Sequence, residues 1–444
     1  MQLTSGSLRA ALGSAVSALL VPALAPAAAQ AQAQTQGGPK ATDAATSPDT
    51  TTWQAEGAVL LYKEGAGRVT ALEPVVSLRR VDGNERAWGL KLTLDALTGA
   101  SPNGAVAQPG VQTFTTPSGK STYSTPAGRM PLDPTFRDTR LALAATHERP
   151  VGAAARASFG LGVSAEHDFA SVTASAALAY DLAQKNTTLS LGVALEADRI
   201  QPEGGVPQGL QAAGPARASG TATRQVADLL LGVTQVMNRR WVTQLNLGLG
   251  RGTGHQSDPY KVLSVVDGTS GLLTGDRLVH EQRPEQRTRV SLFWQNKVHL
   301  TDDVVDASYR YYSDNWGVRA HTLDLRWRSE LGSGWYLEPR VRLHRQSAAD
   351  FYRPWLLEST EWDSAVHRTA LTAASADPRL AAFTGRTLGL KLGLPLRRGE
   401  FAVRLEAYRQ QQRQPAFAPG ALRGLELAPA LTAATVFVGY VRPF

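Results

Sequence analysis

The chain has 444 residues, with 46 Lys or Arg against 38 Asp or Glu, and a formal net charge of +8 at pH 7. It contains no cysteine, which excludes a disulfide-stapled secreted domain. After the N-terminal region, no apolar run reaches the roughly 18 residues that a transmembrane helix needs. The charges alternate along the chain instead of forming one basic face, so a nucleic-acid-binding protein is not indicated.

The first 29 residues are predicted to be a secretory signal peptide. Arg9 is their only charged residue, Ala15 to Ala28 form an apolar core, and Ala27-Ala28-Ala29 gives an A-x-A cleavage pattern. The apolar core is too short to act as a membrane anchor. Residues 30–52 are rich in Gln, Ala, Thr, Gly and Pro, and we expect them to form a flexible leader in the periplasm.

From Trp53 onward the sequence consists of segments in which polar and apolar residues alternate. A period of two indicates β-strands, because successive side chains of a strand point to opposite faces. The segments are about ten to fourteen residues long, which is the length of tilted membrane-spanning strands. We predict about sixteen strands, near 53–63, 68–80, 86–98, 134–147, 152–166, 170–181, 187–199, 223–236, 241–252, 286–299, 304–313, 318–330, 334–346, 384–396, 400–412 and 432–444.

The alternation is clearest in residues 304–345, which contain three of these strands. On the first of them, Tyr309 and Tyr311 fall on the apolar side, and Asp306 and Arg310 fall on the other. A soluble sheet that buries its apolar face remains an alternative. Aromatic residues on one face and full charges on the other nevertheless fit better with a transmembrane barrel, which has lipid outside and a polar lumen inside.

The connections between the predicted strands alternate between short and long, apart from a few short ones on the long side. Outer-membrane barrels have short periplasmic turns and long outer loops. The N-terminus of the first strand and the C-terminus of the last strand are therefore both expected on the periplasmic side. The short turns are predicted at 82–84, 148–150, 184–186, 238–240, 301–303, 332–334 and 397–399. The long loops are predicted at 99–133, 200–222, 253–285, 347–383 and 413–431.

The last strand carries an assembly signal. Tyr440 and the terminal Phe444 stand at alternate positions of an apolar face, which resembles the closing strand that the barrel assembly machinery recognises. Arg442 departs from that pattern, and Pro443 is tolerated because it lies at a strand end. We therefore predict one all-β domain over residues 53–444, a transmembrane antiparallel barrel of about 14 to 18 strands in the outer membrane.

Several phrases of the sequence resemble an uncharacterised family of Gram-negative outer-membrane barrels, known only as a domain of unknown function. They span most of the mature chain and lie at 58–64, 94–104, 133–140, 305–316 and 346–353. The resemblance implies the fold and the outer-membrane location. It implies no activity, because the family has no assigned one.

The predicted lumen is rich in arginine. An excess of Arg or Lys around a constriction selects for anions, so we expect a porin-like passage for small, preferably anionic solutes. The alternative is a set of cross-strand ion pairs that satisfy one another. The candidate selectivity residues are Arg289, Arg310, Asp324, Arg326, Arg328, Glu338, Arg340, Arg342, Arg404 and Glu406.

Aromatic residues and two loops are further candidates. Barrels carry aromatic girdles where the lipid meets water, and Tyr309, Tyr311, Trp316, Trp327 and Trp335 are assigned to such a girdle, which anchors the protein in lipid. The loop 99–133 is expected to be mobile, and it either covers the surface, folds inward as an eyelet or forms a small carbohydrate or metal contact. The residues that surround it are Asp95, Asn103, Asp133, Asp138 and Arg140. The aromatic start of loop 347–383, at Asp350, Phe351, Tyr352, Arg353 and Trp355, either holds a ligand or belongs to the girdle.

The sequence predicts no catalytic, cofactor or metal site. The eight histidines show no H-x-x-H or HExxH spacing, and no G-x-S-x-G stands on a strand–turn–helix unit. An envelope hydrolase whose site is built from distant side chains stays a remote alternative. The second hypothesis after the channel is a non-conducting barrel that serves as scaffold or conduit for a periplasmic partner, with the leader 30–52 as its docking segment.

Overall fold

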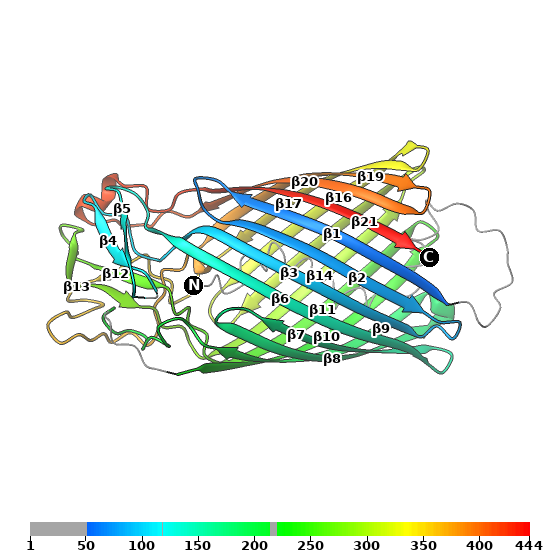
Figure 1. Cartoon of the computed structure of the whole chain (residues 1–444), viewed down its shortest axis with the longest axis horizontal. Coiled ribbons are helices and arrows are strands. Elements are labelled where there is room, and N and C mark those ends of the chain that lie inside the picture. Colours follow the sequence, from blue (N-terminus) through cyan, green and yellow to red (C-terminus); the bar gives the residue numbers. More distant parts are fainter. Residues whose placement is uncertain (1–50, 118, 214–219) are drawn as a thin grey trace.

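The protein is a closed barrel in the computed structural model, which describes residues 51–117, 119–213 and 220–444 (Figure 1). Sixteen strands close it in the order β1-β2-β3-β6-β7-β8-β9-β10-β11-β14-β15-β16-β17-β19-β20-β21. Their bounds are Thr52–Glu64, Thr70–Val81, Ala87–Pro102, Leu132–Val151, Ala155–Ala165, Phe169–Leu182, Thr187–Ile200, Ala222–Asn238, Trp241–Gly254, Gln286–His299, Asp303–Asp314, Arg319–Gly332, Trp335–Gln346, Phe383–Leu396, Gly399–Gln412 and Leu431–Pro443.

The predicted all-β barrel is confirmed, and each of the sixteen predicted ranges overlaps one barrel strand. The predictions of a signal peptide over 1–29 and of most of the leader concern residues outside the described ones. Helical structure is limited to three short 3-10 segments in the described part, Ala183–Lys185, Pro378–Leu380 and Gly420–Gly424. None of the described helices has the length and apolar character needed to cross a membrane.

The first and last strands close the barrel. β1 and β21 run antiparallel with Leu61 opposite Val436, and at their shared end the backbone amides of Trp53 and Phe444 each donate to the other's carbonyl at 2.9 Å. The ring of Phe444 also stacks against Trp53, with 6.5 Å between centroids. Closure leaves no unpaired strand edge, which is the condition for a sheet to lie in lipid.

The outer face of the barrel is apolar. On β16, Leu323, Leu325 and Trp327 alternate with polar residues and are each more than 40% exposed, and Leu388 on β19 is 63% exposed. A water-soluble sheet buries such residues, whereas a barrel turns them toward hydrocarbon and keeps its polar face inside. The described strands therefore form a belt for contact with lipid.

The short turns lie at the end of the barrel that holds the C-terminus (Figure 1). Asp82 caps one of them, since its side chain accepts hydrogen bonds from the backbone amides of Asn84 (3.0 Å) and Arg86 (2.9 Å). One predicted turn is wrong. Residues 148–150 continue β6, and the chain reverses at Gly152, whose φ of 68° is a conformation that glycine adopts without strain.

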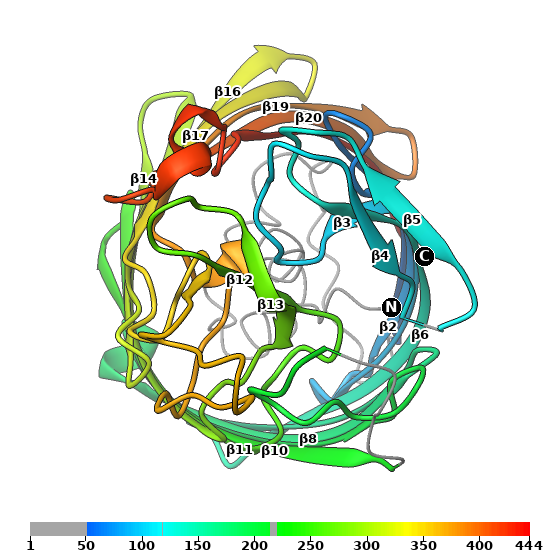
Figure 2. The same ribbon diagram turned by 90° about the vertical axis from the view of Figure 1, so that its left-hand side faces the viewer.

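The long loops build a folded layer over the opposite mouth (Figure 2). We call the described residues of 103–131, 201–221, 255–285, 347–382 and 413–430 the cap. It contains a hairpin of β4 (Gln112–Thr115) and β5 (Thr122–Thr125), and a three-stranded sheet of β12 (Val262–Val266), β13 (Leu273–His280) and β18 (Leu356–Leu357).

The cap has a hydrophobic core of its own. Leu263, Val265, Val279, Leu356 and Trp362 are fully or almost fully buried in it. Val106 of loop 99–133 is 6% exposed and packs with Val266, Trp355 and Leu422 in a second core. This loop is therefore packed structure, where a mobile loop was expected. No cap strand was predicted from the sequence, because segments of two to eight residues carry too few positions to establish an alternation.

The aromatic girdle is present in part. Tyr309 and Tyr311 on β15 flank His321 on the outer face, Trp327 is 49% exposed, and Trp335 is 46% exposed. Trp316 does not belong to it: this side chain is only 3% exposed and donates its indole N–H to the Gln286 carbonyl at 2.9 Å. Trp316 follows β15 in a turn, where the strand alternation no longer determines which way a side chain points.

Candidate functional site

A cavity of about 1010 Å³ lies inside the barrel beneath the cap. Its wall is formed by the inward faces of β6–β11 and β14–β17. Arg283, Arg379 and Leu380 of the cap also line it, and they close it from above. A lumen lined by polar side chains follows from the strand alternation, which places every second side chain inside the barrel.

Positive charge predominates in the lining. Nine arginines and six carboxylates line the cavity, which leaves an excess of three positive charges. The arginines are Arg224, Arg283, Arg287, Arg289, Arg310, Arg326, Arg340, Arg342 and Arg379, and the carboxylates are Glu148, Glu166, Glu196, Asp228, Asp306 and Asp324.

A network of charges at one wall joins side chains of three strands, β16, β17 and β20. The Arg340 guanidinium donates to both oxygens of Asp324 at 3.1 Å and to Glu406 Oε1 at 2.8 Å. Arg326 approaches the same Asp324 carboxylate at 3.3 Å. Arg340 is 9% exposed, so its charge is largely neutralised within the wall and contributes little to the field in the cavity.

Arg310 and Arg342 have a different environment. Both line the cavity, and in the described residues neither has a carboxylate oxygen within 4.0 Å. The Arg310 guanidinium lies over the ring of Phe293, 5.3 Å from its centroid. Arg342 is opposite Asp324 in the strand register, but Arg340 and Arg326 pair with that carboxylate. Two guanidinium charges therefore face the cavity without an ion-pair partner in the part of the chain that the structure describes.

The remaining predicted lumen residues fall into two groups. Arg289 lines the cavity and pairs with Asp228 at 2.8 Å. Arg328, Glu338 and Arg404 lie nearer the short turns and are outside the lining of the cavity. Arg328 stacks on Tyr336, 3.7 Å from the ring centroid, and Arg404 lies 5.4 Å from that of Phe437. The ten candidates thus do not form one ring of charge.

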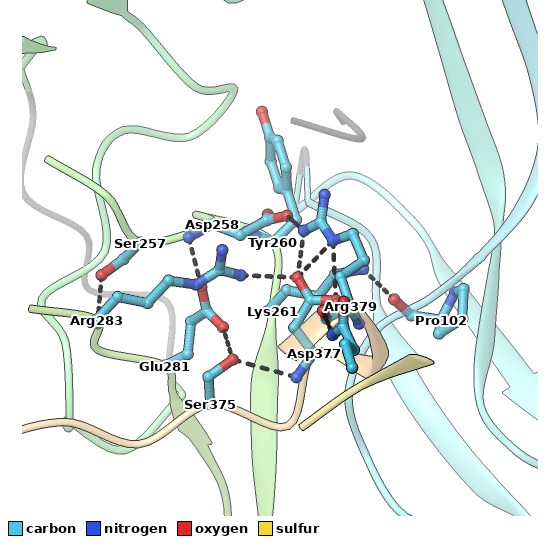
Figure 3. Close-up of polar contacts among 11 residues, drawn as sticks. Pro102, Ser257, Asp258, Tyr260, Lys261, Glu281, Arg283, Ser375, Asp377 and Arg379 are labelled. Atoms are coloured by element: carbon cyan, nitrogen blue, oxygen red, sulfur yellow. Dashed lines mark hydrogen bonds and ion pairs between the residues drawn. The ribbon is translucent and has the colours of Figure 1, made fainter. Parts of the chain in front are cut away.

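The cap contains a second charged cluster, which was not predicted from the sequence (Figure 3). Asp377 accepts from both Arg379 and Arg283, the latter at 2.7 Å, and Arg379 also pairs with Asp258 at 2.8 Å. Glu281 pairs with Arg283 at 2.7 Å. These residues come from two loops nearly a hundred positions apart, so no local sequence motif predicts the cluster.

Burial and charge act against each other in this cluster. Burial alone would raise the pKa of Asp377, but the positive charges of Arg379 and Arg283 outweigh it and hold this pKa well below its usual range. Burial lowers the pKa of Lys261, whose ammonium group donates to the Pro102 carbonyl at the start of a third loop. The cluster therefore ties three long loops together, and through Arg283 and Arg379 it forms the roof of the cavity.

The loop candidates from the sequence make contacts within the protein. Arg140 pairs with Asp95, Asn103 donates to the Tyr123 hydroxyl at 2.9 Å, and Asp133 accepts from the Thr135 hydroxyl at 2.7 Å. In the next loop, Phe351 is buried with its ring edge-on to Trp316. No group of three His, Cys, Asp or Glu that could hold a metal ion occurs among the residues that the structure describes.

The fold and the lipid-facing belt define a sixteen-stranded transmembrane β-barrel with a capped, arginine-rich lumen. Residues 10–442 match the family model described as a protein of unknown function (DUF3570), and the chain belongs to this family. No curated protein matches the chain.

Several solved outer-membrane proteins are similar in structure. They include the siderophore receptor PirA from Pseudomonas aeruginosa, with 8% identity, a TM-score of 0.40, and coverage of 90% of this chain and 66% of that one. OccK2 (OpdF) from P. aeruginosa, solved in complex with glucuronate, has 11% identity, a TM-score of 0.38, and coverage of 89% and 98%. OpdK from P. aeruginosa has 10% identity, a TM-score of 0.37, and coverage of 89% and 99%. The chain thus spans just under two thirds of the length of PirA.

Proposed function

We propose that this protein is an outer-membrane channel that passes small anionic solutes. The observation that carries the proposal is the pair Arg310 and Arg342, two guanidinium groups that face the cavity without an ion-pair partner among the described residues. A charge beside a narrow space with low-dielectric walls attracts counter-ions and raises their local concentration. Arginines that are paired with carboxylates, such as Arg340, contribute to the shape and rigidity of the wall and not to the attraction of anions.

The cap determines how a solute reaches this pair. Its packed core and its buried charged cluster hold the loops over the mouth, so entry is restricted to small solutes that pass between or beside these loops. The channel is then selective in two steps, first by size at the cap and afterwards by charge at Arg310 and Arg342.

The orientation of the barrel follows from its connections. The long loops belong at the cell surface and the short turns in the periplasm, as in other outer-membrane barrels. Residues 1–29 serve for export and are removed, and residues 30–52 remain as a periplasmic leader. Tyr440 and Phe444 of the closing strand are the contacts for the barrel assembly machinery; the exposed Phe444 ring beside Trp53 supports this role.

A non-conducting barrel is the second candidate function. The observation in its favour is the cap, whose hydrophobic core and buried ion pairs are features of a stable plug more than of a mobile lid. In that case the barrel anchors a periplasmic or envelope partner, and the leader docks it. An envelope hydrolase has no arrangement of side chains in its favour within the described residues.

Single-channel recording separates the two functions. Refolded protein in a planar bilayer under a salt gradient should give discrete steps with an anion-selective reversal potential. The double variant Arg310→Gln/Arg342→Gln should shift this potential toward cations, because it removes the two unpaired charges. The matched control is Arg199→Gln/Arg251→Gln, which removes two exposed arginines from the outer face of β9 and β11 and should leave selectivity unchanged.

One result would overturn the channel, and another would overturn the role of Arg310 and Arg342 in its selectivity. Stable insertion without conductance would show a plugged barrel and would favour the scaffold. Conductance with a reversal potential that the two double variants affect equally would show that Arg310 and Arg342 do not set the selectivity.

A further inference from the structure

The outer face of the barrel carries a group of basic side chains at its long-loop end. We call Arg319, His321, Arg345, Arg386 and Arg409 the outer basic cluster. They lie on four strands that are consecutive in the barrel, β16, β17, β19 and β20, and all five are exposed. They are separate from the cavity, because their strands present alternate residues to the lumen.

The strand alternation places these side chains on the lipid-facing side. His321 stands two residues from Leu323, Arg345 two from Leu343, and Arg386 two from Leu388, and each of these leucines is exposed on the outer face. In every case the basic residue is on the long-loop side of the leucine. The cluster therefore lies just beyond the apolar belt, at the depth where lipid headgroups meet the barrel.

The register brings like charges together. His321 is directly opposite Arg345, and Arg386 is directly opposite Arg409. Arg345 is opposite Thr384, which is only two residues from Arg386 on the same face. Like charges opposite one another destabilise a sheet, and within the described residues none of the four arginines has a carboxylate oxygen within 4.0 Å.

Aromatic side chains border the cluster on one side. The Tyr309 hydroxyl and His321 Nδ1 are 2.7 Å apart, and the Tyr311 ring lies 5.2 Å from that of His321. Tyrosine is enriched where hydrocarbon meets headgroups, because its ring is apolar and its hydroxyl is polar. This contact gives a second indication of the depth, independent of the leucines.

We propose that the outer basic cluster binds the phosphate groups of a phosphorylated lipid in the outer leaflet. Guanidinium groups bind phosphate through two parallel hydrogen bonds, and neighbouring arginines on adjacent strands suit a headgroup that carries more than one phosphate. The exposed leucines directly below would contact its acyl chains. A soluble anion would satisfy the arginines and leave this apolar surface without a partner.

The test is a lipid-binding titration of the full-length barrel in neutral detergent. Native mass spectrometry would count bound diphosphoryl lipid A, with the dephosphorylated form of the same lipid and inorganic phosphate as separate probes. We expect saturable binding of the diphosphorylated lipid and much weaker binding of the other two probes. Arg345→Gln/Arg386→Gln should weaken binding about twenty-fivefold, because each arginine near a charged lipid surface contributes about fivefold.

Two further variants make the result specific. Arg345→Lys/Arg386→Lys keeps the charge but loses the two parallel hydrogen bonds of a guanidinium group, so its affinity should fall between those of the parent and the glutamine variant. Arg80→Gln/Arg442→Gln removes two outward arginines at the short-turn end and should leave binding unchanged. Equal weakening by the variants at both ends, or binding of the dephosphorylated lipid as tight as that of the phosphorylated one, would overturn the proposal. Heat-modified migration on gels checks that each variant is folded.

Discussion

Arg340 reaches Glu406 across an intervening strand. Its Nη1 atom donates to Glu406 Oε1 at 2.8 Å, and Gly389 on β19 lies between them, opposite Arg340 on one side and opposite Glu406 on the other. A Cβ atom at Gly389 would be 3.1 Å from Glu406 Cγ and 3.4 Å from Arg340 Cβ. The missing side chain of this glycine is therefore what allows the ion pair to span two strand spacings.

We predict that Gly389→Leu destabilises the barrel by about 2 kcal/mol, because it separates a partly buried charged pair. Urea unfolding of the refolded barrel in detergent measures the change. Gly57→Leu is the matched control, since a Cβ at Gly57 has no neighbour within 4 Å. An equal loss in both variants would mean that leucine in a strand, not the broken pair, is responsible.

Asp324 limits the anion selectivity of the proposed channel. It neutralises Arg340 and Arg326, so Asp324→Asn should leave more positive charge in the cavity and shift the reversal potential further toward anions. The shift should be opposite in sign to that of Arg310→Gln/Arg342→Gln and about half its size. Asp302→Asn, on an exposed short turn, makes the same charge change outside the cavity. A shift toward cations in Asp324→Asn would contradict this account of the wall.

The stability of the cap should depend on pH through two buried carboxyl groups whose pKa values are shifted in opposite directions. The pKa of Asp377 is held below its ordinary value of 3.8, so its stabilisation is complete above that pH and is lost as the pH falls through the lower, folded-state value. Burial raises the pKa of Glu281 above 4.5, so its contribution is complete below pH 4.5 and is lost as the pH rises through the raised value. The cap should therefore be most stable in mildly acidic solution.

Hydrogen exchange with mass spectrometry, corrected for intrinsic rates, measures cap opening in 255–285 and 347–382. Protection should rise from neutral pH to about pH 4.5 and fall below about pH 3.8. Asp377→Asn should remove the acid-side loss, and Asp363→Asn, an exposed carboxyl in the same loop, should keep it. If protection fell below about pH 3.8 in both variants alike, groups other than Asp377 would be responsible for the loss of cap stability in acid.

Arg379 connects the stability of the cap to conduction. It pairs with Asp377 and Asp258 and also lines the cavity, so Arg379→Met leaves buried carboxylates with fewer partners and should cost the cap about 3 kcal/mol. We expect larger or noisier single-channel steps and faster proteolysis within 347–382. Arg353→Met, which breaks a more exposed pair with Glu361 in the same loop, should change neither. Unchanged conductance with a loosened cap would show that the cap does not limit flow.

The barrel could be predicted from the amino-acid sequence alone. Each strand carries its own alternation of lipid-facing and lumen-facing residues, so a local pattern such as Leu323, Leu325 and Trp327 is enough to place it. The alternation of short and long connections along the chain also predicted that the first strand begins, and the last strand ends, on the side of the short turns. Such features depend on neighbours in sequence, and sixteen repetitions made the inference robust.

Whether a charged side chain has an ion-pair partner depends on the tertiary structure. Arg340 and Arg342 are two residues apart on one inward face, yet the first meets Glu406 across Gly389 and the second has no carboxylate partner among the described residues. The sequence likewise placed Trp316 in the girdle and missed the cluster around Asp377. Pairing across a barrel depends on the register of strands far apart in the chain. Burial beneath a cap depends on how separate loops pack, and neither leaves a periodic pattern in the sequence.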